Sequence, residues 1–413
     1  MCIPWARAFQ GGHEMLVALM GAFCSLVVPA YAFDAGPIPN VKSMCNYLAG
    51  QDEWNLEAWR ADLDGMKAVG LNTVWVVNVW AAFQPDVEGE CKQDRLEWLR
   101  SVCRAAQERE MSVLLVAAYI GEGWGPKNVD VPVWPLIPKH RAQNLRYLRW
   151  LAKGVAEFDN VFYLLCTEEI LPATLLYRPN ERDECIASFI SWAREVNPNI
   201  DDWNKRWGTQ HTWETLVPPP TTQRKTWQTW HDLNRWFTAL MRELLPPMSA
   251  AIRQGDPGAV IGFHDFLVDP ALKQPIEERP TAAACGFDFF SIGYYYISDK
   301  TFDENVQGLR SRVKAAREYH PDVPAFCGET GLAVRKKPEQ ARKDDEALQV
   351  RWFREILPYL LGEGVGYSLW SWRTVVPSAE AIHSIYRADG TPRPSLEALR
   401  HIHEAAAAGK RPE

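Results

Sequence analysis

Nearly continuous apolar runs recur along the chain, and eight of them have the composition of β-strands. Runs of this kind are typical of strands that are covered on both faces, as in a parallel sheet. Longer stretches with the helical spacing of apolar residues lie between most of them, for example EAWRADLDGMKAVG and NVQGLRSRVKAAREY. The strands are expected at residues 41–48, 73–79, 112–119, 161–167, 260–264, 287–295, 325–328 and 365–370.

This alternation of strands and helices predicts a (β/α)8 barrel, the TIM barrel, because a chain of 413 residues holds eight such units and some insertions. The largest insertion follows the fourth strand, at about residues 168–226, and is rich in Trp. A doubly wound sheet would need a glycine-rich phosphate loop after an early strand, and NYLAGQDEW is not one. No repeat or linker divides residues 33–413, which we therefore interpret as one catalytic domain.

The first 32 residues have the pattern of a secretion signal. Arg7 lies in a short polar lead, an apolar stretch runs from about Met15 to Val28, and AYA ends at Ala32. We expect cleavage near Ala32 and a secreted or periplasmic protein. No later run reaches the ~20 apolar residues that a membrane span requires, so no membrane span is expected after cleavage.

Composition and charge narrow the range of partners. The formal net charge of −7 argues against a nucleic-acid partner, which would call for clustered Lys and Arg. The chain contains 19 Trp, 13 Tyr and 16 Phe, and aromatic faces stack well on the apolar faces of sugars. Outside the predicted signal, 7 of the 9 Cys remain without any CxxC pair, and no HExxH motif occurs. We therefore expect neither a metal nor another cofactor.

Two acidic side chains follow apolar runs, in FYLLCTEE at the fourth strand and AFCGE at the seventh. The carboxyl-terminal ends of barrel strands meet on one face, so Glu168 and Glu329 are expected to point into one bowl. Hydrolysis of a glycosidic bond needs such a pair: one group protonates the leaving oxygen, and the other meets the positive charge at the sugar carbon. Single strand-end acids also form ion pairs or cap helices, so the prediction depends on the pair. Glu169 competes with Glu168, because neighbouring strand residues point in opposite directions.

Other strand ends carry residues suited to contact a sugar. A lone aromatic residue often belongs to the core, and a lone histidine is as readily a buried one with satisfied hydrogen bonds, but a cluster of polar-tipped rings at one rim favours a ligand. The candidates are Asn78, Trp80, Tyr119, Trp124, His264, Asp265, Tyr294 to Tyr296, Trp370 and Trp372.

Two segments resemble a known family. CIASFISWAREVNPNIDDWNKRWGTQHTWETLVPP (185–219) is similar to the stretch that follows the acid/base strand in family 42 glycoside hydrolases, the β-galactosidases of clan A. WSWRTVVPSAEAIHS (370–384) resembles the eighth-strand segment of the same family. The two matches occur in the correct order, and with the strand pattern the likeness spans most of residues 40–400.

The resemblance implies a retaining mechanism with Glu168 as the general acid/base and Glu329 as the nucleophile. It puts Tyr295 in the place of the strand-six tyrosine, and Trp372 with Arg373 on the family's WR motif. Thr167 stands where the clan usually has an Asn that contacts the sugar, so Thr167 is a predicted substrate contact. Glu169, the neighbour of Glu168 at the same strand end, is another.

The sequence thus predicts an exported retaining β-glycosidase, similar to β-galactosidases, with a carbohydrate substrate. One alternative is a carbohydrate-binding barrel without catalysis, suggested by Thr167. Another is an endo-acting clan A glycanase, in which the Trp-rich residues 203–236 add subsite walls. The sugar, the linkage, the disulfide pairing and the oligomeric state stay open at this point.

Overall fold

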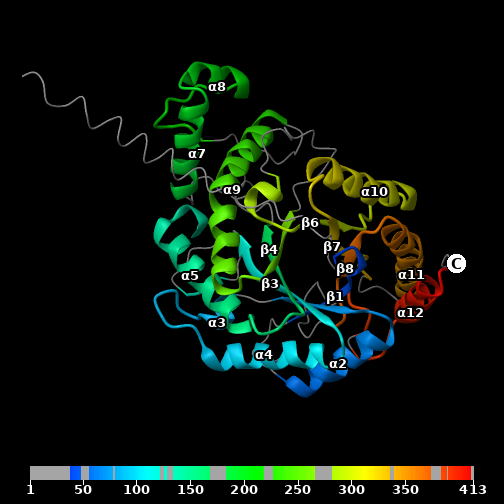
Figure 1. Cartoon of the computed structure of the whole chain (residues 1–413). Coiled ribbons are helices and arrows are strands. Elements are labelled where there is room, and N and C mark those ends of the chain that lie inside the picture. The colour runs from blue at the N-terminus through cyan, green and yellow to red at the C-terminus, as the bar shows by residue number, and fades with distance from the viewer. Residues whose placement is uncertain are drawn as a thin grey trace, which may run out of the picture. The chain divides into compact units, whose positions relative to one another are not determined.

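Eight parallel strands close into a barrel in which each strand pairs with its neighbours in chain order, and β8 pairs with β1 (Figure 1). The predicted (β/α)8 barrel is confirmed, and each of the eight predicted apolar runs overlaps one strand. The strands are β1 (Lys42–Tyr47), β2 (Thr73–Val77), β3 (Ser112–Ile120), β4 (Val161–Thr167), β5 (Val260–Asp265), β6 (Phe289–Tyr295), β7 (Ala325–Gly331) and β8 (Gly366–Leu369).

The structure is a computed structural model. It describes residues 38–47, 55–77, 80–120, 125–127, 134–167, 183–217, 227–265, 281–334, 339–373, 383–387 and 389–410. All of these residues belong to one compact unit, Pro37–Glu413. The predicted signal segment lies outside the described residues.

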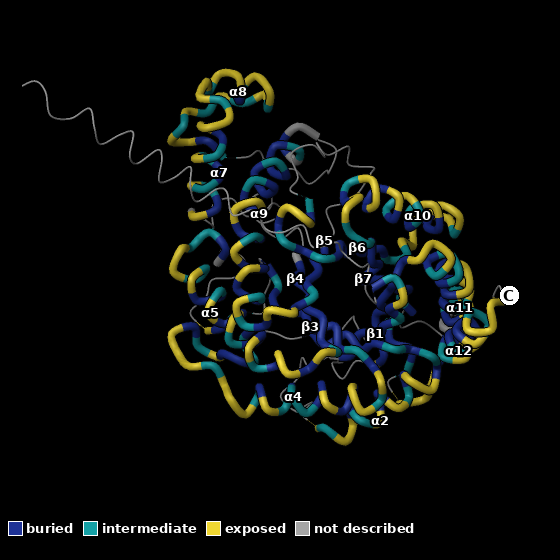
Figure 2. Tube along the Cα trace, viewed as in Figure 1, coloured by how far each residue is buried: buried dark blue, intermediate teal, exposed yellow. Residues whose placement is uncertain are grey.

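Helices surround the barrel and present their exposed sides away from the strands (Figures 1 and 2). Side-chain caps start some of them: Asn55 accepts from two backbone N–H groups at the start of α2, and Thr301 forms a capping box with Glu304 at the start of α10. None of the described helices is long and apolar enough to cross a bilayer. The helices are α2 (Leu56–Ala68), α3 (Trp80–Phe83), α4 (Gln93–Gln107), α5 (Pro138–Val155), α7 (Asp183–Val196), α8 (Ile200–Trp207), α9 (Trp227–Gly255), α10 (Phe302–Tyr319), α11 (Glu339–Gly362) and α12 (Pro394–Ala407), with short 3-10 turns η1 (Ile38–Asn40), η2 (Trp134–Leu136) and η6 (Ala283–Cys285).

Apolar side chains form two separate layers, one inside the barrel and one between the strands and the helices. Successive residues of a strand alternate between them, as β geometry requires: Phe289 packs inside, whereas Phe290 packs against the helices. Which layer a side chain joins therefore decides whether it can reach a site inside the barrel. The interior layer consists of Ile38, Val41, Cys45, Trp75, Val77, Leu114, Val116, Phe162, Leu164, Cys166, Phe289, Phe326 and Trp370.

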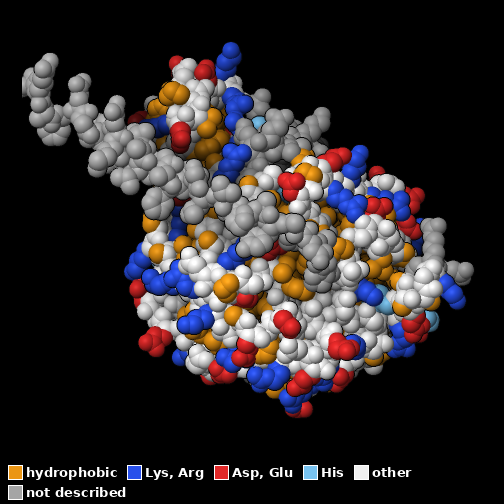
Figure 3. Space-filling view, viewed as in Figure 1, with side chains coloured by type: hydrophobic (Ala, Val, Ile, Leu, Met, Phe, Trp, Pro, Cys, Tyr) orange, Lys and Arg blue, Asp and Glu red, His pale blue; other side chains and the backbone are white. Residues whose placement is uncertain are grey.

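The segment between β4 and β5 carries α7, α8 and α9, and several of its described aromatic residues pack on one another. Phe189 of α7 lies at the centre of this cluster, with ring centroids 5.5 to 6.3 Å away on four tryptophans. Asp232 of α9 is fully buried and accepts hydrogen bonds from Arg206 and from the indole N–H of Trp207, which ties α8 to α9. On the face shown in Figure 3, basic and acidic side chains are interspersed over the helices. The four tryptophans around Phe189 are Trp192, Trp203, Trp207 and Trp236.

Candidate active site

Glu329 lies within β7, two residues before the end of the strand, rather than just past it as the apolar run to residue 328 predicted. Its side chain is only 5% exposed. The hydroxyl group of Tyr295, on β6, donates a hydrogen bond to Oε2 of Glu329 over 2.9 Å. A buried carboxylate is unfavourable unless such partners compensate for its desolvation. The pair therefore forms a polar centre near the carboxyl-terminal ends of β6 and β7.

A β-bulge turns Glu329 toward the barrel interior. In β7, Phe326 packs inside and Cys327 outside, so strict alternation would point Gly328 inward and Glu329 outward. The register against β6 shifts at this point: Ile292 pairs with Cys327, but the next residue, Gly293, pairs with Glu329. Gly328 is thus an extra residue, and extra residues of this kind re-aim the side chains that follow them.

Gly328 contacts a buried polar pair, which leaves no room for a side chain at this position. A Cβ atom at Gly328 would lie 2.0 Å from Oγ of Ser291 and 2.7 Å from Nδ1 of His264. These two atoms share a hydrogen bond of 2.6 Å, and both side chains are fully buried. Burial, assisted by the charge of Arg312, lowers the pKa of His264 to about 3, so the imidazole is neutral at physiological pH. The glycine is required by the neighbouring side chains on β5 and β6.

The helix layer supports the bulge from the outside. Arg312 of α10 donates a hydrogen bond to the carbonyl oxygen of Gly293, the residue that pairs with Glu329. Its guanidinium group also lies over the ring of Tyr294, 5.4 Å from the centroid. A bulge interrupts the ladder of backbone hydrogen bonds between strands. The guanidinium group of Arg312 therefore gives the carbonyl oxygen of Gly293 a hydrogen bond from outside the sheet.

Three further predicted residues face the same interior. Trp370, at the end of β8, packs edge-on against Trp75 with ring centroids 5.9 Å apart. The carbonyl oxygen of Trp370 lies 2.8 Å from where a Cβ atom of Gly331 would be, and the peptide bond between Trp370 and Ser371 is cis. Tyr119 is partly buried against the interior layer, and His264 lies 6.1 Å from Trp75 between ring centroids. Trp370, Tyr119 and His264 therefore share the interior with Tyr295 and Glu329.

Other predicted contacts lie outside the barrel interior instead: Trp80 begins α3, Tyr294 takes an outward position of β6, and residues 372–373 follow the end of β8. Trp80 donates to Gln84, and Tyr294 stacks on Trp352 of α11. Trp372 is buried, and its indole N–H donates to Asp62 of α2 over 3.0 Å. Arg373 donates to the same carboxylate. None of the described contacts joins these four, Trp80, Tyr294, Trp372 and Arg373, to Glu329.

The remaining predicted residues fall partly or wholly outside the described structure. Thr167 and Asp265 are the last residues of β4 and β5, where their backbones pair with each other, and nothing further is described of their side chains. The chain continues from Thr167 into Glu168. The residues outside the described part of the chain are Asn78, Trp124, Glu168 and Glu169.

His383 joins the site although it was not among the predicted site residues. Its ring lies 5.2 Å from that of Tyr295, edge to face. Its Nδ1 is buried and has no hydrogen-bond partner among the described residues, and burial lowers the pKa of His383 to about 4, with a contribution from Arg393. The nearby segment is anchored, because Arg387 forms a bidentate ion pair with the buried Glu346. The only hint in the sequence was the AEAIHS stretch of the resemblance.

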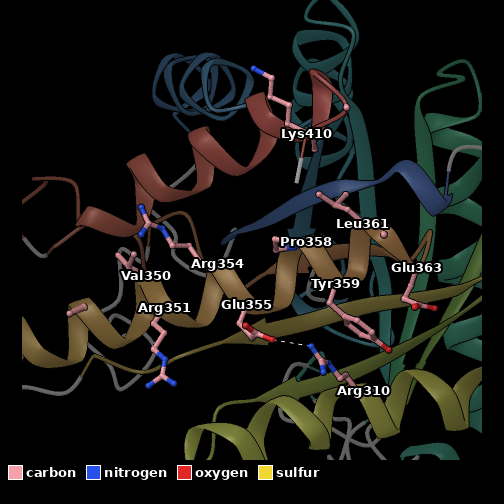
Figure 4. Close-up of a pocket in the computed structure, with 14 residues that line it drawn as sticks. Arg310, Val350, Arg351, Arg354, Glu355, Pro358, Tyr359, Leu361, Glu363 and Lys410 are labelled. Atoms are coloured by element: carbon pink, nitrogen blue, oxygen red, sulfur yellow. Dashed lines mark hydrogen bonds and ion pairs between the residues drawn. The ribbon is translucent and has the colours of Figure 1, made fainter. Parts of the chain in front are cut away.

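A separate groove of about 990 Å³ lies among α10, α11 and α12 (Figure 4). The ion pair between Arg310 and Glu355 crosses it, and Arg351, Arg354 and Lys410 contribute further positive charge. None of the residues that line it ends a barrel strand, and its Arg310–Glu355 ion pair is partly exposed, whereas Glu329 is buried. The interior face of β6 and β7 is therefore the stronger candidate for chemistry. Among the described residues, no cluster of three His, Cys, Asp or Glu side chains could hold a metal ion.

The fold is that of solved glycosidases. The chain is similar to the β-galactosidase of the psychrophilic Marinomonas ef1, with a TM-score of 0.60 and 16% identity over 90% of this chain. It is similar to the exo-β-1,4-mannosidase of Opitutaceae bacterium strain TAV5, with a TM-score of 0.59 and 18% identity over 89% of this chain. It is also similar to GH5_18 of Streptomyces cattleya, solved with GlcNAc, with a TM-score of 0.53 and 17% identity over 88% of this chain and 80% of that one.

At identities of 16 to 18%, the similarity shows the barrel fold and does not show the activity. The chain spans 60% of the length of the Marinomonas and Opitutaceae proteins. No protein-family model and no curated protein sequence matches the chain.

Proposed function

We propose that this protein is a retaining glycoside hydrolase that cleaves β-glycosidic bonds, with Glu329 as its nucleophile. The observation that carries the proposal is the buried Glu329 carboxylate, turned into the barrel by the bulge at Gly328 and bonded to Tyr295. Acidic residues at this edge of a barrel are the groups from which glycosidases build their sites. The similarity of the fold to solved glycosidases adds support.

The proposed reaction has two displacements. One oxygen of Glu329 attacks the anomeric carbon while Glu168 protonates the departing glycosidic oxygen, which forms a covalent glycosyl-enzyme. Glu168 then removes a proton from water as the water displaces Glu329, and the product keeps the original anomeric configuration. Tyr295 donates to Oε2 of Glu329, which fixes the orientation of the carboxylate for the attack.

For the substrate we propose a β-linked hexoside, with β-galactosides and β-mannosides as the first candidates. The motif resemblance favours galactosides, and structural neighbours include a β-galactosidase and an exo-β-1,4-mannosidase. We also propose that the chain is exported. N-terminal sequencing of the mature protein is then expected to begin near Phe33, and an intact N-terminus after expression in an exporting host would contradict export.

Turnover of aryl β-glycosides by the purified protein tests the proposal. Glu329→Gln should lower kcat by about four orders of magnitude or more, and Glu168→Gln by about 10²- to 10⁴-fold for glycosides with poor leaving groups. Glu169→Gln is the comparison: as a substrate contact it should raise KM, but it should keep a much higher kcat than Glu168→Gln if Glu168 is the acid/base. A comparable loss in Glu169→Gln alone would reassign that role.

Product stereochemistry tests the retaining mechanism separately. Proton NMR of the first products should show retained configuration, because retention requires the two carboxyl groups to lie only ~5 Å apart. An inverted product would mean a water-mediated single displacement and would remove the nucleophilic role of Glu329. Calorimetric binding of oligosaccharides without any turnover would favour the non-catalytic carbohydrate-binding alternative.

A further inference from the structure

His264 and Ser291 form a buried polar pair that the proposed reaction does not use. Both residues are fully buried on the interior face of neighbouring strands, β5 and β6, and their backbones pair directly. Their side chains meet at 2.6 Å. Buried polar groups cost free energy to desolvate, and an interior of apolar residues would fill the same space without that cost. A specific positional role would explain why polar residues occupy this place.

The pair touches the backbone that determines the direction of Glu329. The Cβ position of Gly328 lies within 3 Å of both Oγ of Ser291 and Nδ1 of His264, so the extra residue of the bulge rests on the two side chains. Without that extra residue, Glu329 would occupy an outward-facing position of β7. The contact of this pair with Gly328 thus lies one residue before Glu329 in the chain, on the interior face of the sheet.

We propose that His264 and Ser291 are positioning residues: together they hold the bulge at Gly328 and so keep Glu329 turned toward Tyr295 and the substrate. The proposal rests on the proposed function of Glu329 as the nucleophile. Loss of the Ser291 hydroxyl would remove the hydrogen bond to His264 and open space beside Gly328. The backbone at Gly328 could then move into this space. Even a small movement is enough to misplace the reacting oxygen of Glu329.

Ser291→Ala is the central variant, because it removes one hydroxyl group and adds no atom. We expect kcat for an aryl β-glycoside to fall by about 10- to 100-fold, since a misplacement of ~1 Å costs about that much, while KM stays within about two-fold. Ser291→Cys keeps a group that can bond the imidazole and should recover part of the loss. Gly328→Ala should be more severe than Ser291→Ala, because its Cβ atom would overlap Ser291.

Ser43→Ala is the matched control. Ser43 of β1 is also fully buried, and Ser368 donates a hydrogen bond to its hydroxyl group over 3.3 Å. The control removes a comparable interior hydroxyl two strands away from β7 in the closed barrel. It should leave kcat within about two-fold of the wild type. Equal kcat values in Ser291→Ala and Ser43→Ala would overturn the positioning role.

Crystal structures of the same variants separate this inference from the proposed function. If the wild type hydrolyses no glycoside, the proposed function fails, and the contact between Tyr295 Oη and Glu329 Oε2 becomes the readout. Loss of that contact in Ser291→Ala, with its retention in Ser43→Ala, would support the positioning role. Retention of the contact and of the bulge in both variants would overturn it.

Discussion

The hydroxyl group of Tyr295 lies 2.9 Å from Oε2 of Glu329, and the two side chains meet only because β7 contains one residue more than β6 between their paired positions. The bond joins neighbouring strands and ends on a buried carboxylate, where hydrogen bonds to a charged group are stronger than in water. It orients the carboxylate before any substrate arrives. The site is thus organised by strand register as well as by residue identity.

Tyr295→Phe should impair catalysis more than it impairs folding. A hydrogen bond to a charged group contributes about 1.5–3 kcal/mol, and the loss of that amount in the transition state corresponds to a fall in kcat of about 10- to 150-fold. Steady-state kinetics with an aryl β-glycoside measures the effect. Tyr294→Phe is the matched control, because Tyr294 faces the helix layer and its hydroxyl lies 3.4 Å from Asn305. Equal kcat values for the two variants would contradict a role of Tyr295 at Glu329.

The sequence predicted every strand of the barrel, because runs of apolar residues that are buried on both faces are easy to recognise. Burial on both faces also means that the pattern does not indicate which side chains point into the barrel. In a strand with one polar face, alternation marks the inner residues, but a doubly covered strand carries no such signal. From the strand pattern alone, Tyr294 and Tyr295 are equally suited to contact a sugar, and so are Trp370 and Trp372. The family resemblance favours Tyr295 and Trp372, of which only Tyr295 faces the interior. Only the packing of the helices distinguishes the members of each pair.

The bulge was likewise beyond the reach of the sequence. A Cβ atom at Gly328 would overlap the side chains of Ser291 and His264, which come from other strands. Register between strands depends on neighbours that are distant in the chain, here residues of β5 and β6. A glycine within a strand is typical of a bulge or of a close approach by another group. Gly328 has both: the register shifts there, and Ser291 and His264 approach it closely. Glu168 and Glu169 remain predictions, since they lie outside the described residues.

Trp372→Phe should lower stability without changing substrate binding. The indole of Trp372 is buried and donates to Asp62, a buried carboxylate whose pKa is raised by burial and lowered in part by Arg373. Loss of the donor should cost about 1–3 kcal/mol of unfolding free energy, measured by urea denaturation, with KM unchanged. Trp370→Phe is the comparison, because Trp370 faces the interior and should change KM or kcat instead. A rise in KM in Trp372→Phe would restore Trp372 as a substrate contact.

Asp232→Ala should loosen α8 from α9. It leaves the indole N–H of Trp207 and the guanidinium group of Arg206 without their buried acceptor, at a cost of about 1–3 kcal/mol. Cleavage by trypsin after Lys205 or Arg206 should become faster. Asp202→Ala, an exposed position on α8, should have a smaller effect on this cleavage.

If this insertion forms polysaccharide subsites, Asp232→Ala should also lower activity on polymers while sparing short aryl glycosides. Equal losses on both substrates would contradict that role.

His264 should make the free energy of unfolding depend on pH in acid. Its pKa is about 3 in the folded protein, against an ordinary value of 6.5, because burial and then the charge of Arg312 disfavour the imidazolium form. As pH falls below about 6.5, the unfolded chain takes up a proton that the folded protein does not, so stability falls by at most about 1.4 kcal/mol per pH unit. His264→Gln lacks this titration. The stability difference between wild type and variant should therefore be largest above pH 6.5 and shrink toward pH 4. His383 and His403, whose pKa values are also lowered by burial, titrate in both proteins and cancel in the difference. A difference that stays constant between pH 7 and pH 4, measured by urea denaturation, would mean that His264 has the same pKa in the folded barrel as in the unfolded chain.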